Sequence, residues 1–403
     1  MFPEDTSPAE PGTYLPVFIR LDNMQEIPMT PEQWLARLVQ IPSVTPLHAG
    51  PRAGQAGEGR IAAQLAQWFG ELGAEVILED AHPNRPNVYA IWRNPASDRW
   101  IALDCHTDTV GVEQMPGDPF SGEIRDGRVW GRGSVDDKAS LAVALSVLQG
   151  MRAAGAVPAA NLIVAAVADE EVALGGAFVF DAWLRGRGLR LDELVVAEPT
   201  LCAPCYGHMG SARIDFRVQG VSTHTSQPHL GRNAIVGAAR IVLAMQAEHE
   251  RLQTVAATPV GKGQLSAIQI GGGRAPNIVP DLATLGFNRR VTSDEDEQAV
   301  MAGLAQLGKD AAGLPTEAEI FRPMSAFLQD PNSAMVRQFG AWSGQAPVTV
   351  PYCSDASAYR PDTVKNILVM GPGSIDQAHG AEEWVEISEL ERMAGVYRQW
   401  WAK

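Results

Sequence analysis

Short apolar runs alternate with amphipathic segments over the first half of the chain. Ile61, Leu65, Trp68 and Leu72 recur at helical spacing, and Gly73 follows them as a helix stop. Apolar strands that alternate with helices predict an α/β domain, in which helices cover both faces of a mixed central sheet. The strand-like and helical segments on which this prediction depends lie at 74–79, 87–93, 100–105, 123–130, 137–155, 161–171 and 192–200.

The pattern changes after Thr200. Residues 211–220 and 283–291 alternate between apolar and polar positions as half-buried strands do, whereas 233–252 and 294–308 have helical spacing. We therefore predict an inserted α+β domain over 206–317. The α/β domain is then discontinuous, with one part at 29–205 and the other at 318–403, and residues 1–28 form an N-terminal extension.

Length, charge and cysteine content limit the classes of protein to consider. The 403 residues are too many for one typical core, and the formal net charge of -15 argues against nucleic acid as a partner. We found no apolar run that approaches the roughly 20 residues of a membrane span, and the acidic N-terminus does not resemble a secretory signal. Four cysteines fit a reduced setting better than a disulfide framework, so we expect a cytoplasmic protein.

Acids and histidines collect where the predicted strands end. His106 and Asp108 follow the strand at 100–105, and residues two apart in an extended segment point to the same side. By itself this pair also fits a core histidine beside a capping acid. More acids and one late histidine, however, occur at other predicted strand ends and turns: Asp136, Glu170, Glu171, Glu198 and His379.

Such a set of ligands suits divalent metals. Oxygen and nitrogen donors without thiolate fit zinc, with cobalt or manganese as alternatives. Carboxylates crowded together repel one another unless cations neutralise them, and two-metal sites of this kind serve hydrolysis. We therefore predict two divalent metal ions, with zinc as the first choice.

Six motifs in order carry a family resemblance: "HTDTV", "GRGSVDDK", "ADEE", "AEPT", "GVSTHTSQPHLGRNAI" and "GPGSIDQAHG". Over residues 30–403 the chain resembles the co-catalytic zinc amidohydrolases, which include acetylornithine deacetylase, succinyl-diaminopimelate desuccinylase, aminoacylase and bacterial glutamate carboxypeptidase. The last motif, together with "APCYGHMG", looks most like acetylornithine deacetylase.

The resemblance implies a role for each matching residue. The metal ligands would be His106, Asp136, Glu171, Glu198 and His379, with Asp136 bridging both ions. Asp108 would orient His106, and Glu170 would be the general base. Asp137 is expected to start the following helix. By the same resemblance, the parts at 29–205 and 318–403 would form the catalytic domain and the insertion at 206–317 a lid. His224 resembles a lid histidine that reaches the active site of the partner subunit in a homodimer formed through the lid.

Substrate-binding positions are implied in the same way. Asn277, Arg290 and Gly373 match residues that hold the free carboxylate of the substrate. The alternative for Arg289 and Arg290 is a pair with the acidic run at 293–297 on the lid surface. By strand alternation these two arginines face opposite ways, and we expect Arg290 to enter the cleft.

The sequence leads to one preferred function and two alternatives. We expect a metal-dependent hydrolase that cleaves the amide bond of N-acyl amino acids. The first alternative is a dipeptidase or carboxypeptidase of the same family, and the second is a non-catalytic relative that binds an acyl amino acid. A general base at Glu170 disfavours the second, because binding alone requires no base.

Cys202 and Cys205 have redox spacing, but no helix begins at the first of them, so we expect inert thiols.

Overall fold

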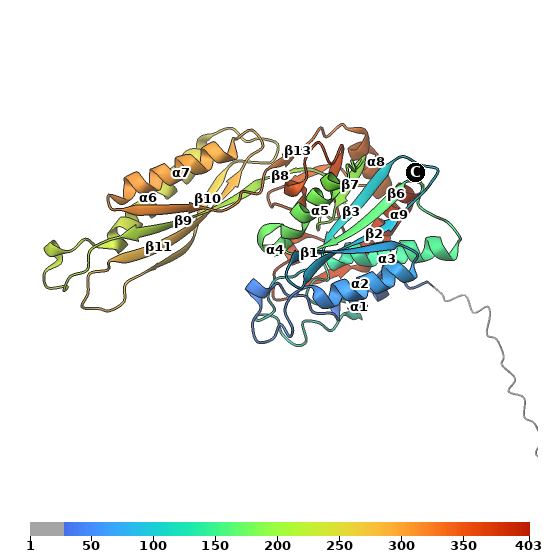
Figure 1. Cartoon of the computed structure of the whole chain (residues 1–403), viewed down its shortest axis with the longest axis horizontal. Helices are drawn as coiled ribbons and strands as arrows, with labels where there is room; N and C mark the ends of the chain where they lie inside the picture. Colours follow the sequence, from blue (N-terminus) through green and yellow to red (C-terminus); the bar gives the residue numbers. More distant parts are fainter. Residues whose placement is uncertain (1–27) are drawn as a thin grey trace, which may run out of the picture.

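The computed structural model describes residues 28–403 as two lobes (Figure 1). The larger lobe contains both the early and the late parts of the chain, drawn in blue, green and red. The middle part, drawn in yellow to orange, forms the smaller lobe. Residues 1–27 of the expected N-terminal extension lie outside the described residues.

The larger lobe is built around a nine-stranded mixed sheet, which confirms the predicted α/β fold class. The strands pair in parallel at its centre, where β3 lies between β6 and β7, and antiparallel at the β1–β2 edge. The order is β1 (Glu75–His82), β2 (Arg85–Trp92), β6 (Asn161–Val167), β3 (Trp100–His106), β7 (Glu193–Val196), β15 (Ile367–Val369), β8 (Cys205–His208) and β13 (Phe327–Leu328), with β14 (Val348–Val350) paired to β8.

Helices cover both faces of this sheet. Strand residues alternate between two buried clusters, so that Leu103 and Cys105 pack on one face and Ala102 on the other. On the first face lie α1 (Pro31–Val39), α2 (Gly59–Glu71), α3 (Lys138–Ala153), α8 (Ala334–Ser343) and α9 (Ile387–Trp401). The second face packs against α5 (Gly175–Gly186), which follows the short helix α4 (Glu170–Ala173).

The smaller lobe has its own sheet and its own core. Helices α6 (Ala234–Thr254) and α7 (Glu297–Ala312) cover one face of it, and the opposite face carries polar side chains. The strand order is β10 (Gln264–Gly272), β11 (Leu282–Val291), β9 (Gly210–Gln219) and β12 (Thr316–Ile320), so β10 is an edge strand. The division of the chain at residues 206 and 317 stays a prediction.

A third, three-stranded sheet of β16 (Trp384–Glu386), β5 (Arg128–Trp130) and β4 (Glu123–Arg125) includes the hairpin expected at Asp126–Gly127. Short 3-10 turns occur at Pro46–His48, Pro228–Leu230, Asp355–Ala358 and Ile375–Gln377. Within the described part of the chain, the helices are too short or too polar to cross a membrane.

Candidate active site and metal centre

The parallel strands β3, β6 and β7 end at one edge of the large sheet, and their following residues meet there. His106 is the last residue of β3, and its side chain is 1% exposed. Its Nε2 atom lies 2.8 Å from Oδ1 of Asp136, and its Nδ1 atom lies 3.0 Å from the backbone oxygen of Asp108. A histidine at the end of β3 and an acid from the loop before α3 are thus in direct contact.

The carboxylate of Asp108 contacts the start of α4. It accepts hydrogen bonds from the backbone N–H groups of Glu170 at 3.0 Å and Glu171 at 3.2 Å, and it lies 3.6 Å from Nδ1 of His106. A carboxylate is favourable at a helix N-terminus, where backbone N–H groups have no partner within the helix. Asp108 therefore fixes the position of both glutamates, whereas its backbone carbonyl makes the closer contact with His106.

His379 contacts two of the predicted acids, although it comes from a distant part of the sequence. Its Nε2 atom lies 3.0 Å from Oε2 of Glu171 and 3.3 Å from Oδ2 of Asp136. These two acids come from the loop before α3 and from α4, whereas His379 comes from the loop before β16. The structure therefore brings three other predicted residues, His106, Glu171 and His379, together around Asp136.

Burial and crowding shift the pKa values of this cluster. Burial, together with neighbouring carboxylates, raises the pKa of Glu170 well above its usual range and that of Glu171 to about 7. Burial also acts to raise the pKa of Asp136, but hydrogen bonds from His106 and His379 hold it below its ordinary value. Hydrogen bonds to Asp136 and Glu171 raise the pKa of His379 to about 10. The carboxylates of this cluster thus stabilise a positively charged group beside them, such as protonated His379.

Two groups of donor atoms are compact enough to hold metal ions. Atoms of His106, Asp136 and Glu171 lie within 4.8 Å of one another, and so do atoms of His106, Glu170 and Glu198. Burial raises the pKa of Glu198 well above its ordinary value, and the Glu170 carboxylate adds to this shift. Oxygen and imidazole donors at this density fit a pair of divalent cations. Glu170 belongs to a compact group itself, and its role as base instead of ligand stays a prediction.

Sequence reasoning missed a buried ion pair that supports the Asp136 loop. Nη1 of Arg132 lies 2.5 Å from Oε2 of Glu383, and both side chains are 1% exposed. The other oxygen of Glu383 accepts backbone hydrogen bonds from Val135 and Asp136. Arg132 also donates to the carbonyl oxygen of Gly380 at 3.0 Å. The pair therefore connects the loop of Asp136 to the loop that carries His379.

A second missed network lies behind α4. Asp169, the residue before Glu170, accepts from Nη1 of Arg85 at 2.9 Å and contacts Nε2 of His82 at 2.9 Å. Arg85 makes two further hydrogen bonds with Glu58, and the backbone N–H of Asp169 donates to Glu58. Asp169 has a positive φ of 68°, which few residues other than glycine adopt. Its contacts hold the turn that presents the two glutamates.

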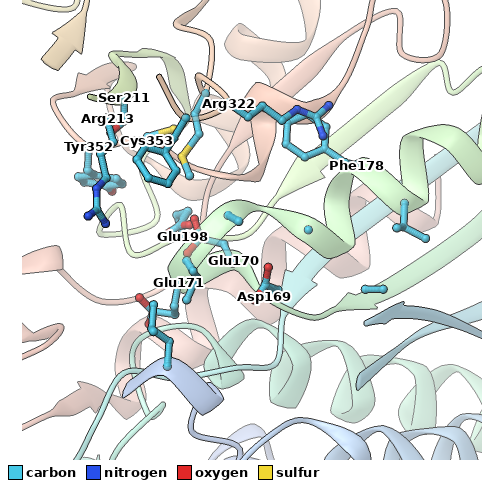
Figure 2. Close-up of a pocket in the computed structure, with 18 of the residues that line it drawn as sticks. Asp169, Glu170, Glu171, Phe178, Glu198, Ser211, Arg213, Arg322, Tyr352 and Cys353 are labelled. Carbon is cyan, nitrogen blue, oxygen red and sulfur yellow. The ribbon is translucent and has the colours of Figure 1, made fainter. Parts of the chain in front are cut away.

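The cluster opens into a cavity of about 1040 Å³ between the lobes. In Figure 2, Glu170, Glu171 and Glu198 gather in its centre, with Ser211 and Arg213 of β9 above them. Arg290 of β11 lies beside Ser211 in the register and lines the same cavity. Arg289, by contrast, is 1% exposed and forms an ion pair with Glu295 of the acidic run.

Besides the buried His106 and Asp108, three predicted site residues do not line this cavity in the chain that carries them. His224 and Asn277 lie next to each other on the small lobe, where the N–H of Thr225 donates to the carbonyl of Asn277, and both side chains are exposed. Gly373 lies in the loop before His379, and its N–H donates to Glu389 at 3.0 Å. The structure therefore groups His224 with Asn277, away from the metal ligands.

Other predicted features of the chain lie where expected. Asp137 precedes the first residue of α3 as its N-cap, and its side chain is buried. Cys202 and Cys205 are buried free thiols, and burial raises the pKa of both to about 12. These two thiols therefore stay protonated at neutral pH, as inert thiols would.

Comparison with known proteins agrees with this geometry. Residues 102–403, well over half of the chain, match the model of peptidase family M20/M25/M40. Among solved structures, a tripeptidase from Staphylococcus aureus is 22% identical, with a TM-score of 0.72 over 92% of this chain and 98% of that chain. An M20 family metallo-carboxypeptidase from Sulfolobus solfataricus is 16% identical, with a TM-score of 0.74 over 93% of this chain and 99% of that chain.

A third similar structure comes from Bacillus subtilis and is described as a dinuclear metal binding peptidase from the M20 family. It is 14% identical, with a TM-score of 0.64 over 92% of this chain and 96% of that chain. The particular resemblance to acetylornithine deacetylase stays a prediction. The chain belongs to peptidase family M20/M25/M40, and it is a metal-dependent hydrolase of that family.

Proposed function

We propose that this protein hydrolyses the amide bond of N-acyl amino acids that carry a free carboxylate. One observation supports this best: the same cavity combines the carboxylate and histidine cluster with Arg290, which has no ion-pair partner among residues 28–403. A planar guanidinium fits a carboxylate through two parallel hydrogen bonds. The scissile amide of a substrate held in this way would face the metal centre.

The roles of the cluster follow from its donors. His106, Asp136, Glu171, Glu198 and His379 would hold the two divalent ions, with zinc as the first choice. Ions held there supply Lewis acidity, which polarises the scissile carbonyl and makes the attacking water more acidic. Glu170 accepts the proton of that water and returns it to the leaving amine. Asp108 keeps Glu170 in place through the backbone N–H of that residue.

The small lobe would contribute residues to the active site of a second copy of the chain. We propose that His224 and Asn277 act in the active site of the partner in a homodimer, since they lie outside the cavity of their own chain. Exposed apolar residues support an interface on this lobe, with Leu243 of α6 70% exposed and Ile270 of the edge strand β10 63% exposed. An edge strand offers unpaired backbone groups to another chain.

A peptidase activity is the second candidate. The similar structures of a tripeptidase and a carboxypeptidase favour it. Both candidates require a free carboxylate near Arg290, and they differ only in whether the group across the scissile bond is a simple acyl or an aminoacyl group. A screen of N-acetyl amino acids against dipeptides, with added zinc, cobalt or manganese, separates them by the ratio of kcat/KM values.

The test of the carboxylate requirement compares an N-acyl amino acid with its C-terminal amide. The acid should be hydrolysed at least about tenfold faster in kcat/KM, because a charge-assisted contact contributes roughly 1.5–3 kcal/mol and ~1.4 kcal/mol is tenfold. Arg290→Ala should remove most of this preference. Arg274→Ala is the matched control, since Arg274 lies on the same lobe and pairs with Asp281 at the surface. Equal rates for acid and amide in the parent enzyme would refute the proposal.

Trans action is tested with mixed dimers. His224→Ala and Glu170→Gln subunits should each be nearly inactive, and mixing them should restore part of the activity, because one site in the mixed dimer keeps both residues intact. Absence of recovery, after exchange of subunits has been demonstrated, would contradict action across the dimer.

A further inference from the structure

Four arginines line the cavity, and they differ in whether a carboxylate neutralises them. Arg213 makes two hydrogen bonds with Asp215, at 2.7 and 2.9 Å, and Arg185 pairs with Asp181 at 2.8 Å. Arg290 and Arg322 form no ion pair within residues 28–403. Two of the four guanidinium groups therefore have no ion-pair partner among the described residues, although carboxylates of the metal cluster line the same cavity.

Arg322 is held in a defined position in spite of its exposure. Its guanidinium carbon lies 3.3 Å from the ring centroid of Phe178, which belongs to α5 of the large lobe. Arg322 itself follows β12 of the small lobe, so this contact crosses from one lobe to the other (Figure 2). The preceding residue, Phe321, packs under Arg213 in a similar contact at 4.8 Å. A guanidinium stacked by its face keeps the N–H donors on its edge free for a ligand.

Among the described residues, the part of the cavity wall that the small lobe contributes carries no carboxylate. Asn288 and Ser211 share the open face of the small sheet with Arg290, and Nδ2 of Asn288 donates to Oγ of Ser211 at 3.0 Å. Both groups are neutral. Positive charge on this wall of the cleft attracts anionic groups of a ligand and disfavours cationic ones.

We propose that Arg322, stacked on Phe178, binds a second carboxylate of the substrate, in addition to the one assigned to Arg290. The preferred substrate is then a dicarboxylate, in which the second acid is part of either the acyl group or the amino-acid side chain. One guanidinium with free edge donors balances one negative charge, which fits a carboxylate rather than a phosphate dianion. This inference rests on the proposed function, because it names the substrate class of the same site.

The experiment compares substrates that differ in one charge. N-succinyl-alanine is paired with N-butanoyl-alanine for the acyl side, and N-acetyl-glutamate with N-acetyl-glutamine for the amino-acid side. In the parent enzyme, one pair should favour the acid by about tenfold or more in kcat/KM, the factor that ~1.4 kcal/mol represents. The pair that responds identifies which part of the substrate carries the second acid. The absence of a preference in both pairs would overturn the proposal.

Two variants locate the effect. Arg322→Gln should reduce the acid-to-neutral ratio to near one, and Arg322→Lys should restore part of it, because an ammonium keeps the charge without the planar fork. Arg185→Gln is the matched control, since Arg185 lines the same cavity but is already paired, and this variant should keep the ratio. If the Arg322→Gln enzyme kept the preference of the parent, Arg322 would not be the second carboxylate site.

A binding measurement separates this inference from the proposed function. If the parent enzyme hydrolyses none of the four compounds, the proposed function fails, and calorimetric titration of the metal-loaded protein with succinate and with butyrate then tests the subsite alone. Succinate should bind more tightly, and Arg322→Gln should remove the difference. Equal affinity for the two acids in the parent protein would overturn the subsite as well.

Discussion

Replacement of Arg132 by methionine tests how much the buried ion pair contributes to the metal centre. In the parent protein this arginine and Glu383 are 1% exposed, with 2.5 Å between their charged atoms. In the variant Glu383 still accepts hydrogen bonds from the N–H groups of Val135 and Asp136, but its carboxylate loses the arginine that pairs with it. The carbonyl of Gly380 also loses its donor.

The expected loss of stability is large because the surviving charge is buried. Removal of one partner of a buried ion pair costs about 3–5 kcal/mol. The same two segments of the chain provide a control, since Arg128 of β5 pairs with Glu386 of β16 at 2.9 Å, with side chains 34% and 35% exposed. Exposed pairs contribute about 0–1 kcal/mol, so Arg128→Met should have a much smaller effect.

The assay is urea-induced unfolding, with and without bound metal, together with the metal content after dialysis. Arg132→Met should lower the free energy of unfolding in both states and should retain less metal, since the loops of Asp136 and His379 lose their connection. The double variant Arg132→Met/Glu383→Gln should be more stable than Arg132→Met, because it no longer buries an unpaired charge. The reasoning is refuted if Arg132→Met costs no more stability than Arg128→Met.

Three further changes have distinct expected outcomes. Glu170→Gln should keep both metals, measured by elemental analysis, but lose ~10²–10⁴ in kcat, the usual contribution of one proton-transfer group, and near-normal turnover would contradict its role as base. Gly373→Ala should reduce the free energy of unfolding by about 1–3 kcal/mol, because the new Cβ would lie 2.1 Å from Cγ2 of Val135 at a positive φ, and Val135→Ala in the same chain should recover part of the loss. Burial lowers the pKa of His208 from 6.5 to about 4. Between these pH values the unfolded chain binds a proton that the folded chain does not, so the free energy of unfolding should decrease by up to about 3 kcal/mol as the pH is lowered from 6.5 to 4. A pH titration of unfolding checks this, and His208→Gln should flatten the slope.

The sequence by itself determined the fold class and most of the residues that gather in the cluster. Period-two alternation separated Arg289 from Arg290, and the structure buries the first and places the second in the cavity wall. Acids at the ends of β3, β6 and β7 could be expected to meet, because the carboxyl ends of parallel strands lie at one edge of a sheet. These inferences succeed because each depends on local geometry and on a short run of residues.

Only the tertiary structure decided the contacts between distant segments. Arg132 and Glu383 are 251 positions apart, and Glu58 and Asp169 are 111 apart, so no local period connects them. The stack of Arg322 on Phe178 depends on how the two lobes pack, which neither segment specifies alone. Burial gives these pairs their energetic weight, because a charge removed from water depends on the one partner that the fold places beside it.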